Sequence, residues 1–328
     1  MGSRGMGWRR IGIGPIAALV LGLCFGVAPG TVSSVRANDL TPQEFLNRLG
    51  DGLKAHGEKD YATALRLLRP FAEQGTALAQ SVLGNMYANG HGVPKDYVQA
   101  AKWYRLAADQ GDAGAQWTLG LMYDIGEGVP QDHVQAVKWY RLAADQGNFL
   151  ALDILCAMYF YGRGVPKDYV QAMKWCRLAA DQGDATAQYN LGSMYDKGQG
   201  VPQDHVQAVK WYRLAADQGD AGAQTQLGSR YAHGWDVPKD HVQAAKWYRL
   251  AADQGDATAQ RTLGLMYDIG EGVPKDYVQA YMWLNLAAAG GSEVAAERRD
   301  AIATRMTPAD ISEAQRLSRE WKPAPAPK

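Results

Sequence analysis

A Val-Pro pair recurs six times along the chain, at a constant interval of 36 residues. Each pair precedes a near-identical block, which reads DYVQAAKWYRLAADQGDAGAQWTLGLMYDIGEG in the copy at residues 96–128. A fixed period of this length predicts a solenoid, in which each unit buries its apolar face only against its neighbours. Solenoid scaffolds usually bind other proteins and seldom do chemistry. The pairs are Val93-Pro94, Val129-Pro130, Val165-Pro166, Val201-Pro202, Val237-Pro238 and Val273-Pro274.

Capping residues and glycines predict two helices in every unit. Asp96 with Gln99 fits a capping box, in which the aspartate accepts a backbone N–H and the glutamine side chain reaches back. Gly111 supplies the left-handed residue that ends this first helix, and Asp112 caps a second helix, which stops at Gly126. Apolar residues recur at three- and four-residue spacing in both segments, so the fold is expected to be all-α.

Two motifs within the unit resemble the Sel1-like repeat family, a relative of the tetratricopeptide repeat. The first is A-x-x-W-Y-x-x-A-A-x-x-G, as at Ala100 to Gly111, and the second is A-Q-x-x-L-G-x-M-Y-x-x-G-x-G, as at Ala115 to Gly128. The resemblance extends over residues 59–291. It implies a right-handed superhelical solenoid of antiparallel helix pairs whose concave groove serves as an adaptor for protein complexes. Exported bacterial members resemble envelope scaffolds, envelope-signalling regulators, polysaccharide-export components or host-interaction factors.

The ends of the chain differ from the repeated region. Residues 1–37 combine early arginines with an apolar stretch from Ile11 to Ala28, which predicts a signal peptide cleaved after Ala37, or else after Ala28. A retained membrane anchor is the alternative, and it is the sole membrane contact expected. We expect a capping helix at 38–58, about seven units at 59–306 with the first and last degenerate, and a second capping helix with a Pro/Ala tail at 307–328. The protein would then be periplasmic or secreted by a bacterium.

The composition favours neither an enzyme nor a nucleic-acid-binding protein. Basic and acidic residues balance at 34 each, and they are interspersed within every unit. His133, His205 and His241 stand where other units carry tyrosine, so we interpret them as interchangeable surface rings. The chain contains no G-x-S-x-G, phosphate-loop or HExxH motif, and its histidines are too widely spaced for a metal site. We therefore expect a non-enzymatic protein without cofactor.

Positions that differ between copies are candidates for a specific function. They lie in the second helix and the following loop, and in one unit that is unusually rich in large apolar residues. Drift and local repacking are the alternative explanations. We expect a protein or peptide partner, with an envelope polysaccharide as the other possibility, because exposed aromatic rings suit both. The candidate binding residues are Trp117, Phe149, Asp153, Phe160, Tyr161, Tyr189, Trp235 and Arg261.

Two cysteines change together in that unusual unit. Cys156 stands at the position of the second-helix glycine, such as Gly120, and Cys176 at that of a first-helix tyrosine, such as Tyr140. Glycine inside a helix costs about 1 kcal/mol against alanine, so its recurrence points to a close helix contact. Cysteines that replace both sides of one contact would either form a disulfide in an oxidising compartment or remain as buried thiols.

Overall fold

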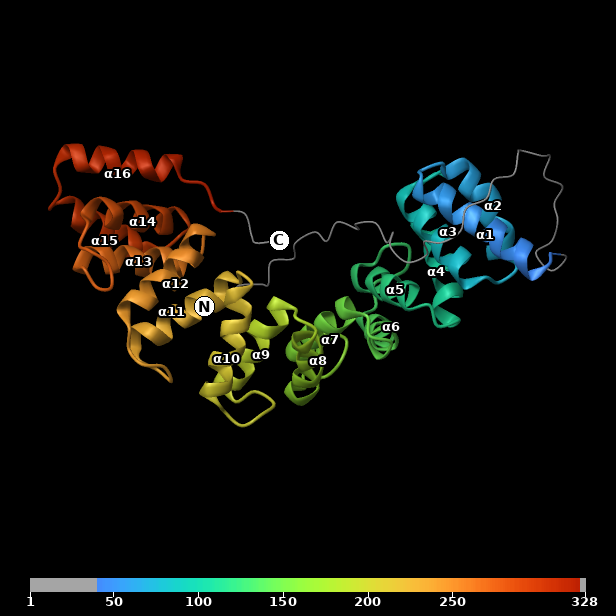
Figure 1. Ribbon diagram of the computed structural model, residues 1–328, viewed down its shortest axis with the longest axis horizontal. Helices are drawn as coiled ribbons and strands as arrows, with labels where there is room; N and C mark the ends of the chain where they lie inside the picture. Colours follow the sequence, from blue (N-terminus) through green and yellow to red (C-terminus); the bar gives the residue numbers. More distant parts are fainter. Residues whose placement is uncertain (1–39, 325–328) are drawn as a thin grey trace. The chain divides into compact units, whose positions relative to one another are not determined.

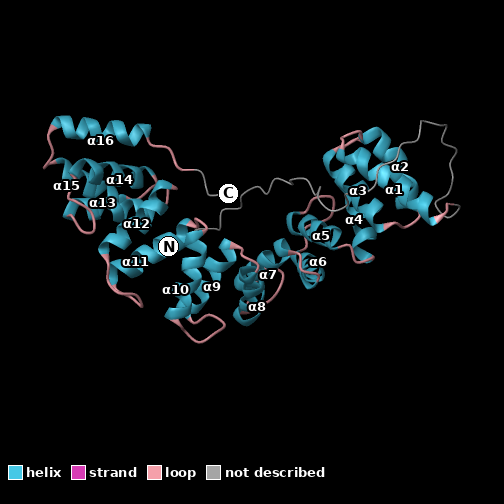
Figure 2. Cartoon of the chain, in the orientation of Figure 1, coloured by secondary structure: helices cyan, strands magenta, loops and turns pink. Residues whose placement is uncertain are grey.

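The computed structural model describes residues 40–324, and within them the regular structure is entirely helical (Figures 1 and 2). The chain forms two compact units, and the boundary between them lies within α5, after Ala115. The first holds α1 (Pro42–Gly57), α2 (Tyr61–Glu73), α3 (Ala77–Asn89), α4 (Tyr97–Asp109) and the start of α5 (Ala113–Ile125). The second holds the rest of α5 and α6 (His133–Asp145), α7 (Phe149–Tyr161), α8 (Tyr169–Asp181), α9 (Ala185–Lys197), α10 (His205–Asp217), α11 (Ala221–His233), α12 (His241–Asp253), α13 (Ala257–Ile269), α14 (Tyr277–Ala289), α15 (Glu293–Ala303) and α16 (Pro308–Glu320).

The helices alternate in type along the repeated region, as the capping residues predict. We call the even-numbered helices α4 to α14 first helices and the odd-numbered helices α3 to α13 second helices. Each of these first helices is capped by an aspartate, and Asp96 accepts the Gln99 N–H at 3.0 Å. The reciprocal half of the expected capping box is not formed there, whereas complete boxes cap α1 and α16 at Thr41 and Thr307.

In four of the repeated units, a contact between a helical glycine and an aromatic ring joins the second helix to the next first helix. A methyl group on Gly84 would lie 2.8 Å from the Tyr104 ring, so the two helices touch as closely as glycine allows. Tyr104 is buried by this contact. The same geometry recurs at Gly120 with Tyr140, Gly192 with Tyr212 and Gly228 with Tyr248, whereas Gly264 approaches the aliphatic side chain of Leu284 equally closely.

A buried glutamine ties three helices together at several steps of the stack. The Gln80 amide donates to the Ala72 carbonyl at 2.9 Å and accepts from the Gln110 amide at 2.7 Å. A buried amide needs partners of this kind, because leaving it unpaired costs about 1–3 kcal/mol. Leu152 interrupts the series in α7. Glutamine-to-glutamine bonds also join Gln146 to Gln116, Gln218 to Gln188 and Gln254 to Gln224.

Irregular helices cover both ends of the repeated region. In α1, a methyl group on Gly52 would lie 2.6 Å from Leu68, so this helix stands in the place of a second helix. At the other end α16 packs on α14 with Ala314 fully buried. No helix within residues 40–324 is long and apolar enough to span a membrane. The predicted signal peptide at 1–37 lies outside the described residues.

The glycine contact predicts opposite effects for two glycine-to-alanine substitutions in the first unit. Gly84→Ala forces a methyl group into the Tyr104 ring, and we expect a loss of about 1–3 kcal/mol despite the better helix propensity of alanine. Gly50→Ala is the matched control, because nothing lies within 4 Å of the added carbon in α1. It should gain up to about 1 kcal/mol. Urea unfolding followed by circular dichroism measures both, and equal effects would contradict the contact.

Candidate protein-binding surface

One side of α7 carries three of the predicted binding residues. Phe149, Asp153, Ala157 and Tyr161 follow one another at four-residue spacing, which places them in a row along the helix. We call this row the α7 stripe. Phe149 is 57% exposed and Tyr161 is 58% exposed, although both are large apolar side chains. At about 1.5 Å rise per residue, the two rings project from points roughly 18 Å apart on the helix.

Three further candidates occupy the position of Asp153 in other second helices. Trp117 in α5, Tyr189 in α9 and Arg261 in α13 are all half-buried there. Residues at this position reach the start of the following second helix, because Thr225 donates to Asp256 at 3.3 Å. The sides of α5, α7, α9, α11 and α13 that bear this position are called the second-helix faces. They differ in chemistry from helix to helix.

The surroundings of Asp153 disfavour the ionised form of its carboxyl group. Burial, and to a lesser extent the nearby Asp184 carboxylate, raise the pKa of Asp153 to about 6. Burial also raises the pKa of Asp220, as do the Asp184 and Asp256 carboxylates, although backbone N–H groups oppose the rise. The second-helix faces of α7, α9 and α11 thus border a row of carboxylates that repel one another.

Two predicted residues do not join the second-helix faces. Phe160 occupies the repeat position that Asp124 and Asp196 hold in the neighbouring units, and it packs inward, with its ring centroid 5.1 Å from that of Tyr169. Trp235 lies in the loop after α11, where it is 55% exposed and stacks on His233 at 4.3 Å. Phe160 therefore serves the core, and Trp235 presents a separate exposed ring.

Asp124 and Asp196 each centre an ion-pair network that local sequence patterns did not predict. Asp124 accepts from Arg163 and lies 2.8 Å from Nδ1 of His133. Asp196 makes the same contact to His205, also at 2.8 Å, and accepts from Arg230. These two histidines are thus partly exposed rings that each also contact an aspartate. The available signal was an aspartate nine residues before each histidine.

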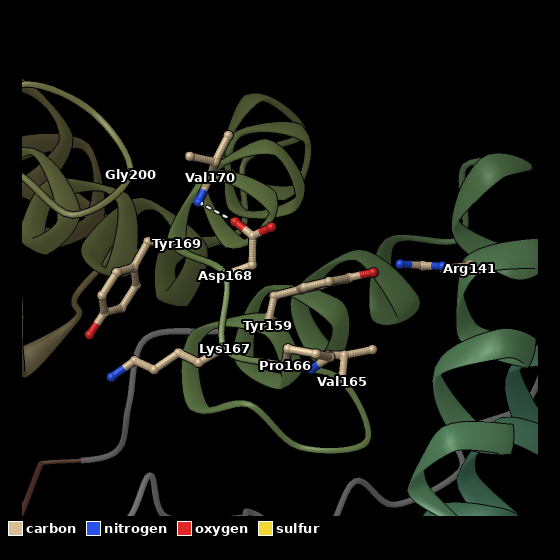
Figure 3. A pocket seen from close by; sticks show the side chains of 9 residues that line it. All are labelled: Arg141, Tyr159, Val165, Pro166, Lys167, Asp168, Tyr169, Val170 and Gly200. Carbon is tan, nitrogen blue, oxygen red and sulfur yellow. Dashed lines mark hydrogen bonds between the residues drawn. The ribbon is translucent and has the colours of Figure 1, made fainter.

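A shallow pocket of about 550 Å³ opens beside α7 (Figure 3). It lies between α6, the end of α7 and the loop leading to α8. Tyr159 directs its hydroxyl toward Arg141, whose guanidinium lies 5.2 Å from the ring centroid. In the equivalent pair Arg177 donates to the Tyr195 hydroxyl at 3.2 Å, whereas the buried Tyr159 hydroxyl has no partner among the described residues. The lining of this pocket offers charged groups, at Arg141, Lys167 and Asp168, together with tyrosine rings.

No group of three or more histidine, cysteine, aspartate or glutamate side chains within residues 40–324 is arranged to hold a metal ion. The carboxylates are instead used in helix caps and ion pairs, as at Asp132 and Asp124.

Cys156 and Cys176 form a disulfide between α7 and α8, with their Cα atoms 5.0 Å apart. Both cysteines are buried in the core of this part of the second unit. The bridge takes the place of the glycine–tyrosine contact found at the equivalent positions, such as Gly192 with Tyr212. A covalent link thus holds the helix that carries the most unusual surface.

The Sel1 repeat family matches most of the described region, from α1 to the end of α14. Its seven matched segments are residues 44–76, 77–112, 113–148, 150–184, 185–220, 221–256 and 257–292. Each segment from residue 77 to 256 begins at or beside a second helix, so the family unit pairs a second helix with the next first helix, as the glycine contact does. No match was found among curated proteins.

Solved structures with the same repeat are similar to the chain. A Sel1 repeat protein from Oxalobacter formigenes is 36% identical, covers 73% of this chain and 96% of its own length, and has a TM-score of 0.61. The protein c5321, a protective antigen of uropathogenic Escherichia coli strains, is 28% identical over 85% of this chain and 84% of its own, with a TM-score of 0.48.

The disulfide predicts a defined thiol count. Protein lacking residues 1–37, and hence Cys24, should show no free thiol in denaturant without reductant and two after reduction. Closing a loop of 20 residues in the unfolded chain should stabilise the fold by about 3 kcal/mol. Cys156→Gly/Cys176→Tyr, which restores the usual pair, should fold with no dependence on reductant. Two free thiols before reduction would contradict the bridge.

The raised pKa of Asp153 predicts that the free energy of unfolding depends on pH in a defined range. The folded pKa of about 6 exceeds the ordinary value of 3.8, so ionising Asp153 destabilises the fold as pH rises between these values. Asp153→Asn should be more stable than wild type by about 1–3 kcal/mol at pH 7, and the difference should vanish near pH 4. Urea unfolding across this range measures it. Asp145→Asn, at an exposed carboxylate, is the control, and a pH-independent gain for Asp153→Asn would contradict the assignment.

Proposed function

Because the chain belongs to the Sel1 repeat family, we propose that it is a non-enzymatic scaffold that binds a protein partner through its second-helix faces. The partner is a protein of the bacterial envelope, or of a host cell that meets it. The α7 stripe provides the central anchors, and the neighbouring faces of α5, α9 and α13 select among partners.

The observation that carries this proposal is the exposure of Phe149 and Tyr161 at the two ends of the α7 stripe. Other second helices have small residues at the position of Phe149, such as Ala185 and Ala221. Burying one large apolar side chain contributes about 1.5–3 kcal/mol, and aromatic anchors dominate binding at many interfaces. Between the rings, Asp153 offers a carboxylate that a basic group of the partner would stabilise in its ionised form.

The second-helix faces on α5, α9 and α13 differ enough in their side chains to give specificity for one partner over another. Trp117 presents an indole, Tyr189 a phenol and Arg261 a guanidinium at the equivalent positions of three helices. Each is half-buried, so its contact area is fixed by the scaffold and little side-chain entropy is lost on binding. A partner that spans several units would contact a different side chain on each second helix.

Two features support a location outside the cytoplasm. Residues 1–37 have the composition of a signal peptide, and the Cys156–Cys176 disulfide suits an oxidising compartment such as the periplasm. A scaffold in this compartment would serve envelope assembly, envelope signalling or contact with a host.

The test is capture of partners from an envelope extract by immobilised protein. Phe149→Ala/Tyr161→Lys converts both anchors into residues that the repeat carries elsewhere, at Ala185 and Lys197, so the fold should be retained. We expect captured protein to fall about tenfold or more, because anchor residues are worth about 2 kcal/mol or more each. Quantitative mass spectrometry of the eluates measures the change.

A matched double variant controls for the loss of exposed apolar surface. Val294→Ala/Leu46→Lys removes two side chains that are 57% and 60% exposed but lie on α15 and α1. It should capture the same proteins as wild type. Equal capture by the Phe149/Tyr161 variant would overturn the role of the α7 stripe. Saturable binding of envelope polysaccharide with no captured protein would overturn the proposal in favour of the glycan alternative.

A further inference from the structure

The helix α16 shows how one surface of a first helix can be covered. Ser318 donates to the Met282 carbonyl at 3.5 Å, and Gln315 donates to the Tyr281 hydroxyl at 3.4 Å. Trp321 meets Trp283 edge-on with the ring centroids 6.5 Å apart. As a result, Met282 on α14 is only 6% exposed.

The same surface is open on the other first helices of the second unit. Its residues stand at four-residue spacing as valine, lysine and leucine, which form one row along each helix. We call these rows the Val-Lys-Leu faces. The valines are 52–64% exposed and the leucines 40–48% exposed, and the lysines between them are exposed as well. The faces are Val134, Lys138 and Leu142 on α6; Val170, Lys174 and Leu178 on α8; Val206, Lys210 and Leu214 on α10; and Val242, Lys246 and Leu250 on α12.

The covered helix differs from the open ones at the central residue. In α14 the row reads Val278, Met282 and Leu286, so methionine replaces the lysine where α16 lies on it. An apolar residue suits a permanent internal contact, because a lysine buried there would lose its hydration without a partner. On the open faces the lysine keeps the free surface hydrated and leaves a positive charge at the centre of an apolar row.

We propose that the Val-Lys-Leu faces of α6, α8, α10 and α12 dock an amphipathic helix of a partner protein that carries an acidic residue opposite the lysine. The covering of α14 by α16 supplies the geometry, and the lysine supplies the charge to be matched. This interaction uses first helices, so it does not depend on the proposed role of the second-helix faces.

The apolar part of the contact follows from α16 itself. Ala314 is fully buried against α14, and Leu317 packs with Met282 and Trp283 in the same cluster. A docked helix would cover the valine and leucine of an open face in the same way. Each face offers only two apolar side chains, so a single contact is weak, and four similar faces raise the overall affinity of a partner with several such helices.

The test uses the α16 segment as the probe, against the full chain. Two labelled peptides of residues 307–322 carry Ser318→Glu or Ser318→Lys, since Ser318 is the residue beside Met282. Fluorescence anisotropy should show the glutamate peptide binding at least tenfold more tightly than the lysine peptide. The glutamate peptide should weaken as salt rises, because exposed charges are screened.

Variants of the protein separate the charge contribution from the apolar one. Replacing Lys138, Lys174, Lys210 and Lys246 by glutamate should reverse the preference between the two peptides. Replacing Leu142, Leu178, Leu214 and Leu250 by serine should weaken the glutamate peptide by about tenfold or more. Replacing the loop lysines Lys167, Lys239 and Lys275 by glutamate is the control and should leave the preference unchanged, with circular dichroism confirming the fold of each variant.

Several outcomes would overturn the proposal. Equal affinity of the two peptides, or an unchanged preference in the four-lysine variant, would show that the lysines do not pair with an acidic residue of the docked helix. Unchanged binding after the leucine substitutions would show that the docked helix does not cover the leucines. Binding of the chain to vesicles of phosphatidylglycerol and phosphatidylethanolamine, lost in the four-lysine variant while neither peptide binds, would assign these faces to a lipid surface instead.

Discussion

The close contact between a helical glycine and the ring of the next first helix determines most of this structure. At Gly84 and Tyr104 there is no room for even a methyl group, so the two helices pack at a fixed separation. Large rings opposite glycine fill the space between helices without voids, as dense protein interiors require. Repetition of this contact at a constant interval turns a short unit into a stack. In α7 and α8 the Cys156–Cys176 bridge serves instead, which is why both positions change together.

Much of the fold was predictable from local sequence signals. Capping aspartates, left-handed glycines and apolar spacing depend on residues a few positions apart, and they identified the helix pairs. The contacts of Asp124 were not predictable in this way, because Arg163 lies 39 residues further on and approaches only when the stack forms. The reciprocal capping bond of Gln99 also failed to form, although the local pattern allowed it.

The sequence predicted which residues belong to the candidate site better than it predicted how their side chains are oriented. Variation among the copies pointed to Phe149, Asp153 and Tyr161, and their four-residue spacing already places them on one side of α7. Phe160 stands next to Tyr161, yet it turns inward, since adjacent residues in a helix point about 100° apart. Which side of α7 faces the core depends on the flanking helices α6 and α8, and the unit's own sequence does not encode that choice.

The two exposed surfaces of the repeat differ in how they vary. The second-helix faces change from unit to unit, as from Trp117 to Tyr189, whereas the Val-Lys-Leu faces of α6, α8, α10 and α12 are constant. Stacking of units does not explain that constancy, because the valine and leucine are about half exposed, and Lys138 and Lys174 lie over the rings of Trp139 and Trp175 in their own helices, at 5.6 and 4.8 Å. Recent duplication of the unit would leave both surfaces equally uniform. A requirement for the same contact in each unit explains why one surface stays constant while the other diverges, and Met282 departs from it where α16 already supplies that contact.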